Sequence, residues 1–202
     1  MSLKTSCQFV VLVSLLSATA AISSNALPLR TQAGRTPANC KPEMLPPMVL
    51  SQIKADYGSW KIQDLSDLSL GARQEWEYKK YGKPSECPGI AIGQFENATQ
   101  SYAVLLVPRS DPDSAYRFLV FSPRTSRTAY QLTILEKSDD PGVRNIFIRT
   151  VRLSDFFNDE SRNKLDVRAN QGILFVEAGE NQYGADVFFW TRNGYRHEPR
   201  EY

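Results

Sequence analysis

Short apolar runs recur along the chain from residue 90 to residue 192. They are rich in β-branched and aromatic residues, and the segments between them carry the Gly, Pro, Asn, Asp and Ser residues that are typical of turns. The strands expected from this pattern are residues 90–95, 101–107, 116–122, 130–137, 145–152, 172–178 and 186–192. Their close spacing predicts a meander sheet of about six or seven antiparallel strands.

The apolar pattern before residue 87 has a helical period instead. Pro46 and Pro47 stand where proline favours a helix start, and apolar residues then recur at helical spacing up to Gly58. A second helix is expected over residues 69–81, with Ala72 and Trp76 on one stripe. We therefore expect an α+β fold in which these two N-terminal helices pack on one face of the meander sheet.

The first 26 residues have the pattern of a secretory signal peptide. Lys4 precedes an apolar run over residues 9–16, and small residues follow as far as Ala26. A membrane anchor is the alternative reading, but the apolar run is well short of the ~20 residues that span a bilayer. We expect signal cleavage after Ala20 or Ala26, no membrane span afterwards, and export to the periplasm or the extracellular space.

The remaining chain is expected to have two parts. Residues 27–47 are proline-rich and lack periodicity, which indicates an extended arm. Residues 48–202 are expected to form a single α+β domain, because 202 residues with 42% hydrophobic content suffice for one core.

Charge and histidine content exclude several classes of function. The formal net charge is only +2, which argues against a nucleic-acid-binding protein. The single histidine, His197, removes metal sites and acid–base sites that need two imidazoles. No nucleophile elbow or phosphate-binding loop is present, so we expect no catalytic residues, no metal and no cofactor.

The cysteines are interpreted in the light of export. Cys7 lies in the signal, which leaves Cys40 and Cys87 in the mature chain. Disulfides persist in oxidising compartments, so the sequence predicts one bridge between them. A reactive thiol is the alternative, and no neighbouring histidine supports it.

Two stretches carry a resemblance to a known group of proteins. Residues 87–95 (Cys-Pro-Gly-Ile-Ala-Ile-Gly-Gln-Phe) lead to Tyr-Ala-Val-Leu-Leu at 102–106, and residues 172–177 lead to Val-Phe-Phe-Trp at 187–190. They resemble exported, uncharacterised bacterial proteins with a degenerate FG-GAP or VCBS-like strand-turn-strand motif. In that group the turn is similar to a calcium loop. Here only Glu96 among residues 94–101 has a carboxylate, so we expect no calcium site.

The candidate binding residues gather around one expected hairpin near the C-terminus. They are Glu177, Glu180, Asp186, Trp190 and His197. Two acids could carry out glycoside hydrolysis, with the aromatic residues Phe188, Phe189 and Trp190 as a platform for the sugar, whereas acidic turns are more often only solvated. Likewise, Trp190 is either a core residue below the second helix, together with Trp76, or an exposed stacking surface.

Two functions from different classes follow. The first is an exported, non-enzymatic binding or interaction protein whose partner is another envelope or secreted protein. The alternative is a glycan or cell-wall hydrolase that uses Glu177, Glu180 and Asp186.

Overall fold

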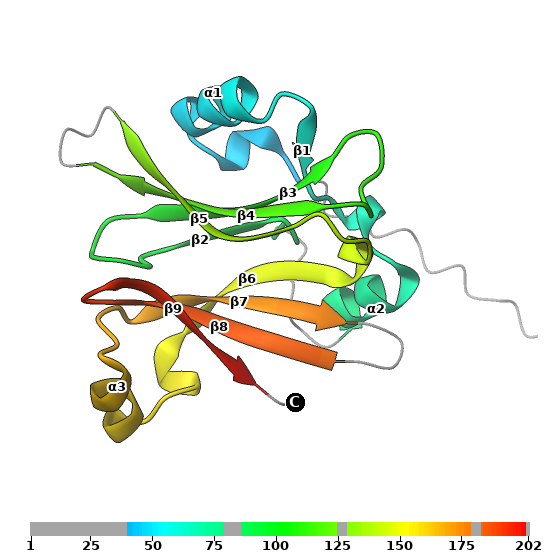
Figure 1. Ribbon diagram of the computed structural model, residues 1–202. Helices are drawn as coiled ribbons and strands as arrows, with labels where there is room; N and C mark the ends of the chain where they lie inside the picture. Colours follow the sequence, from blue (N-terminus) through cyan, green and yellow to red (C-terminus); the bar gives the residue numbers. More distant parts are fainter. Residues whose placement is uncertain (1–39, 79–85, 125–128, 179–182, 201–202) are drawn as a thin grey trace, which may run out of the picture. The chain divides into compact units, whose positions relative to one another are not determined.

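The structure is a computed structural model that describes residues 40–78, 86–124, 129–178 and 183–200. All of them belong to one compact unit, Thr36–Tyr202. The expected signal peptide and most of the expected proline-rich arm lie outside the described residues. The described chain folds into two antiparallel sheets with helices against them (Figure 1).

Sheet A comes from the first half of the unit. Its strands are β1 (Trp60–Ile62), β2 (Ile90–Gly93), β3 (Ser101–Pro108), β4 (Tyr116–Pro123) and β5 (Tyr130–Ser138). The order is β1-β3-β4-β5, and β2 also pairs with β3. β3 and β4 are buried over most of their length, as expected for central strands covered on both faces.

Sheet B is an up-and-down meander from the second half. Its strands are β6 (Ile146–Arg152), β7 (Gln171–Ala178), β8 (Tyr183–Thr191) and β9 (Gly194–Arg200), paired in that order. A turn at Gly194, which has a φ of +111°, joins β8 to β9. A left-handed conformation of this kind suits glycine best.

The two sheets face each other across an aromatic core. Phe118 of β4 lies 5.4 Å from Phe175 of β7 and 5.1 Å from Phe188 of β8, measured between ring centroids. On one side the sheet edges also bond directly. The Ile148 amide donates to the Pro88 carbonyl at 2.8 Å, and the Thr150 hydroxyl donates to the Ile92 carbonyl at 2.9 Å. The sandwich is therefore closed where β2 meets β6.

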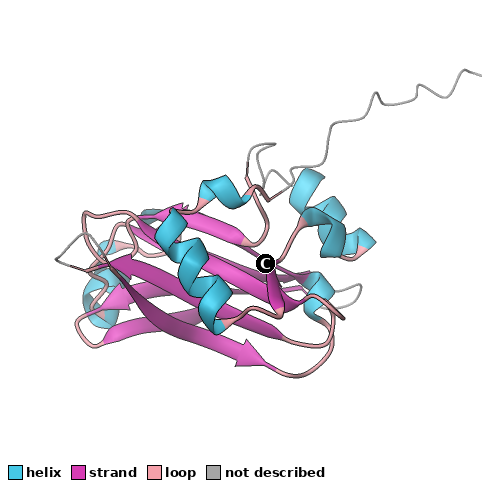
Figure 2. Ribbon diagram, turned by 90° about the horizontal axis from the view of Figure 1, so that it is seen from above, coloured by secondary structure: helices cyan, strands magenta, loops and turns pink. Residues whose placement is uncertain are grey.

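Each outer face is covered by a different helix. Val49 and Ile53 of α1 (Pro47–Asp56) pack on the outward residues of sheet A, among them Phe121. Ala72 and Trp76 of α2 (Leu70–Tyr78) pack instead on the outer face of sheet B. Figure 2, viewed from above, shows helices lying across the strands. The prediction of one sheet of six or seven strands with both helices on one face is therefore wrong, since there are two sheets, of five and four strands. The combination of helices with antiparallel strands is confirmed, in a chain that is mostly β.

Shorter helical segments connect these elements. They are α3 (Asp159–Leu165) and the 3-10 turns η1 (Pro42–Met44), η2 (Leu65–Asp67), η3 (Val143–Asn145) and η4 (Leu153–Asp155). Asn158 caps α3 by accepting from the Ser161 amide at 2.9 Å. None of the described helices is long and apolar enough to cross a membrane.

The expected strands correspond to β2 through β8, and the differences lie elsewhere. The break between the sheets falls in the turn around Gly142, which resembles a turn within a single sheet. β9 was missed because Arg196, His197, Glu198, Pro199 and Arg200 give it the composition of a polar tail. The second helix ends by Tyr78 in the described part, and the remainder of its expected span lies outside the described residues.

The predicted disulfide is present. Cys40 and Cys87 are bonded, with their Cα atoms 4.9 Å apart and a sequence separation of 47. The bond fixes the segment before α1 to the start of β2. A closed loop of this size stabilises the fold by about 4 kcal/mol, mainly by restricting the unfolded chain.

Gly172 offers a sharp test of the sheet B packing. A Cβ at this position would lie 2.6 Å from both the Phe188 carbonyl oxygen and a Leu153 methyl group. We expect Gly172→Ala to lower the free energy of unfolding by about 1–3 kcal/mol, because the backbone oxygen cannot move aside cheaply. Gly184→Ala in β8 is the matched control, since nothing lies within 4 Å of its added Cβ. Urea unfolding of both variants decides, and equal stabilities would contradict the packing described.

The tryptophans give a second test. Trp76 is 3% exposed and lies 5.2 Å from Phe147, in the core below α2 where the sequence placed it. Trp190 is only half-buried and packs edge-on against Tyr195 at 5.0 Å. We expect Trp76→Ala to cost about 3–5 kcal/mol and Trp190→Ala roughly 1–2 kcal/mol. Denaturant unfolding followed by circular dichroism measures both, and a larger loss for Trp190 would reverse the assignment.

Candidate functional site

A cavity of about 230 Å³ lies between the two sheets, next to the connection from β5 to β6. Four carboxyl side chains line it, from Glu136, Asp140, Glu177 and Asp186. Its apolar walls include the rings of Tyr116 and Phe175 together with Val143 and Ile146. We refer to it as the acidic cavity.

Sheet B supplies Glu177 and Asp186 through the register of β7 and β8. Asp186 stands directly opposite Phe175, and Glu177 follows Phe175 by two positions on the same strand. Side chains two apart on a strand share a face, so both acids project on the inner face of sheet B. The sequence singled out these two residues, and the structure brings them to one cavity.

A β-bulge brings Glu136 into the same cavity from sheet A. The pairing of β4 with β5 shifts between Phe118 and Leu119, so that Glu136 pairs with Phe118 and Leu135 is the extra residue. Without the bulge, Glu136 would lie on the outer face with Leu132 and Ile134. The bulge thus redirects this carboxylate inward, as bulges beside binding sites often do.

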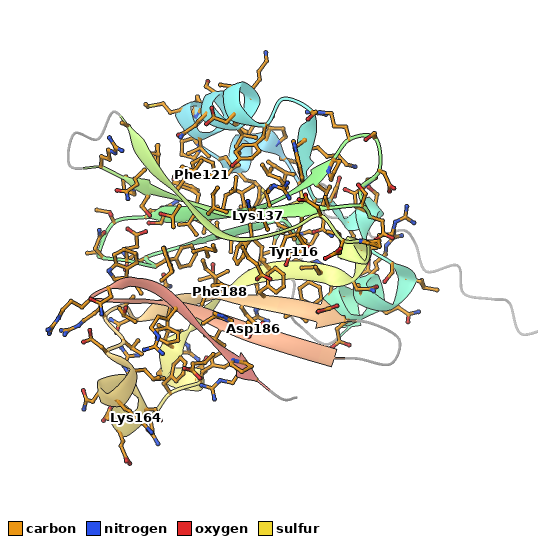
Figure 3. The ribbon with its side chains drawn as sticks, in the orientation of Figure 1. Tyr116, Phe121, Lys137, Lys164, Asp186 and Phe188 are labelled. Carbon is orange, nitrogen blue, oxygen red and sulfur yellow. A yellow bond between two sulfur atoms is a disulfide. The ribbon has the colours of Figure 1, made fainter. Side chains whose placement is uncertain are left out.

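Tyr116 of β4 lies close to carboxylates of both sheets. Its ring is 7% exposed, and its hydroxyl donates to Glu136 Oε1 at 2.7 Å. Burial raises the pKa of the Tyr116 phenol far above its ordinary value, the hydrogen bond to Glu136 raises it further, and the negative charges of Glu136, Glu177 and Asp186 act in the same direction. Tyr116 is therefore a neutral hydrogen-bond donor in the wall of a negatively charged cavity. Figure 3 shows it between the sheets, near Asp186 and Phe188.

His197 completes this group from β9. Its ring stacks on Phe188 with centroids 5.1 Å apart, and its Nδ1 lies 3.3 Å from Asp186 Oδ1. The sequence assigned His197 to a charged tail, but the β8–β9 register places it opposite Phe188. Within the described chain, this is the ion pair that the carboxylates of the acidic cavity make, and it exists only when the imidazole is protonated.

The other predicted site residues lie elsewhere. Glu180 is outside the described residues. Trp190 does not line the acidic cavity and contacts the cluster on the outer face of sheet B. Glu96, the one carboxylate of the calcium-loop-like turn, accepts a hydrogen bond from the Ser122 hydroxyl of β4.

Sequence reasoning missed the residues of the cavity that come from sheet A. Tyr116 has the pattern of an ordinary core residue, and Glu136 has that of a solvated residue on a half-buried strand. The only available signal was a polar pair, Glu136 and Lys137, at the end of an otherwise apolar alternating run. Regular alternation would still place Glu136 on the outer face of sheet A, because a bulge has no distinct sequence pattern that would reveal the change of face.

The arrangement is suited to binding positive charge. The Glu177 carboxylate makes no hydrogen bond or ion pair with the residues that the structure describes, and the Glu136 carboxylate accepts only a neutral donor there. In the same part of the chain, no group of three or more His, Cys, Asp and Glu side chains is arranged to hold a metal ion. An organic cation with an apolar stem matches both the carboxylates and the aromatic walls.

Comparisons with known proteins found no match for this chain among protein-family models, curated proteins or solved structures.

The neutral Tyr116 phenol predicts a specific alkaline behaviour. In the unfolded chain tyrosine ionises at about pH 10, whereas folded Tyr116 keeps its proton above that pH. The folded state then binds more protons, so stability is lost as pH rises above about 10, by about 1.4 kcal/mol per pH unit for each retained proton. We expect Tyr116→Phe to reduce this slope by the contribution of one retained proton, about 1.4 kcal/mol per pH unit. The same substitution should lower the free energy of unfolding by about 0.5–1.5 kcal/mol at neutral pH.

Urea unfolding of the parent and of Tyr116→Phe at a series of pH values measures both effects. The difference in stability between the two proteins should shrink as the pH rises above ten. A difference independent of pH would mean that the Tyr116 phenol ionises at the same pH in the folded state as in the unfolded chain.

Proposed function

We propose that this protein is an exported, non-enzymatic binding protein, and that its acidic cavity receives a lysine or arginine side chain of a partner protein. The observation that carries the proposal is the cavity itself: four carboxylates around a buried, neutral phenol. Among the described residues, its counter-ion is a single exposed histidine, His197.

Charge is the first argument. The chain as a whole is nearly neutral, yet residues from β5, β7, β8 and the β5–β6 connection concentrate negative charge at one place. Walls of low dielectric strengthen the attraction of such a cavity for a cation. A local excess of carboxylates costs stability in the free protein, and a bound cation would relieve that cost.

The apolar walls are the second argument. Phe175 and Tyr116 offer ring surfaces beside the carboxylates. Lysine and arginine have apolar stems below a charged head, and arginine also stacks on aromatic rings. A basic side chain would therefore satisfy both parts of the acidic cavity at once.

Export is the third argument. The chain begins with the pattern of a secretory signal, and the Cys40–Cys87 disulfide fits an oxidising compartment. The partner is then another envelope or secreted protein with an exposed basic residue.

A glycan or cell-wall hydrolase is the second candidate. The observation that favours it is the presence of Glu177 and Asp186 on one cavity, since paired carboxylates are the usual machinery of glycoside hydrolysis. The aromatic platform that the sequence suggested for a sugar does not support it, because Phe188 and Phe189 are buried and Trp190 does not line the cavity.

Isothermal titration with an end-capped peptide containing arginine tests the first candidate. We expect the parent protein to bind this peptide and not its glutamate analogue. Glu177→Gln and Asp186→Asn should each weaken binding by about three- to tenfold, because each removes one attracting charge. Glu160→Gln in α3 is the matched control, since it removes an exposed carboxylate that does not line the cavity.

Two outcomes would reject the proposal. The first is peptide binding that all three variants retain equally. The second is turnover of glycan or peptidoglycan by the purified protein that is abolished by Glu177→Gln or Asp186→Asn, which would establish the hydrolase instead.

A further inference from the structure

β5 is an edge strand whose outer side is unpaired in the described structure. One side of β5 pairs with β4 along its length. Within the described residues, no backbone hydrogen bond joins residues 131–137 to a strand other than β4. The free N–H and C=O groups of such an edge form a template for another extended strand. Natural proteins usually protect an edge of this length.

The other sheet edges show that protection. β2 and β6 bond to each other across the closed side of the sandwich. β1 is only three residues long. β9 carries proline and alternating charge in its sequence Arg-His-Glu-Pro-Arg, which opposes the addition of a strand.

β5 lacks these features over the stretch from Tyr130 to Ile134. The stretch has neither a charged residue nor a proline, and Ile134 is 51% exposed. Lys137, the first basic residue of the strand, comes only after the bulge at Leu135. The edge of residues 130–134 is therefore open, uncharged and partly apolar.

We propose that this edge pairs with the same edge of a second copy of the chain, antiparallel, about a two-fold axis at Leu132. In this register Leu132 faces the partner's Leu132, and Tyr130 faces the partner's Ile134. The polar residues Gln131 and Thr133 face each other as well. No charged residues are opposed, and aromatic with β-branched pairs are among the favourable cross-strand combinations.

Side-chain placement supports this register. Tyr130 and Leu132 pack against the cluster on the outer face of sheet A. Ile134 lies on the same face but outside that cluster. Pairing at Leu132 would place the partner's Tyr130 on Ile134 and extend the apolar layer across both copies. A two-fold arrangement also uses both open edges at once, so association ends at the dimer.

Sedimentation equilibrium of the exported, disulfide-bonded protein across the micromolar range tests the proposal. We expect a reversible dimer for the parent protein. Ile134→Lys, at an exposed position, should raise the dimer dissociation constant by at least about tenfold, since it places a charge in the paired edge. Leu70→Lys is the matched control: Leu70 is 71% exposed at the start of α2, and this variant should dimerise like the parent.

Gln131→Lys provides a second variant on the same edge, at an exposed residue that faces the partner's Thr133. It should also weaken the dimer, and circular dichroism confirms that each variant is folded. A parent protein that stays monomeric throughout this range overturns the proposal. A dimer that withstands both edge variants, or a larger assembly without a dimer end point, overturns it as well.

Discussion

Contact between the aromatic rings of Phe118, Phe175 and Phe188 is the constraint on which the fold depends. One ring comes from sheet A and two from sheet B, and they meet edge-on or tilted at 5.1–6.1 Å. Removing these rings from water holds the inner faces together. Because the inner faces are then covered, the outward residues of the same strands need cover of their own, which α1 and α2 supply.

The acidic cavity is a continuation of this inner face. Tyr116 lies two residues before Phe118, Asp186 two before Phe188, and Glu177 two after Phe175. At one end of the sandwich, three strands thus change together from aromatic to ionisable side chains on the same face. The nearby aromatic core explains why Tyr116 is buried beside carboxylates, and why its phenol remains protonated.

The spacing of apolar residues and the composition of the turns were enough to predict most of the strands, and the number of cysteines together with export predicted the disulfide. The runs that became β2 through β8 have the right residues and turn chemistry, and the pairing of Cys40 with Cys87 followed from export and cysteine count. Glu177 and Asp186 could be selected because they flank one hairpin, and neighbouring strands keep such residues close.

The remaining features depend on tertiary contacts that leave no local pattern. A strand that is apolar on both faces fits one sheet between two helix layers as well as two stacked sheets, so the break at Gly142 was not visible. The bulge at Leu135 places Glu136 on the face opposite to the one that regular alternation with Leu132 and Ile134 would give. β9 has the composition of a tail because an edge strand needs no apolar face of its own, and this concealed the placement of His197 on Phe188.

The same bulge divides β5 into two segments with different surroundings. Before Leu135 the strand keeps regular pairing with β4, so its free edge is straight enough to accept another strand. After Leu135 the side chains of Glu136 and Ser138 turn toward the acidic cavity. Backbone atoms of residues 130–134 and carboxylates of the cavity thus belong to one strand but face different directions. Occupation of the edge by a second copy would leave the cavity carboxylates available to a ligand, since a bulge ends the regular pairing before Glu136 is reached.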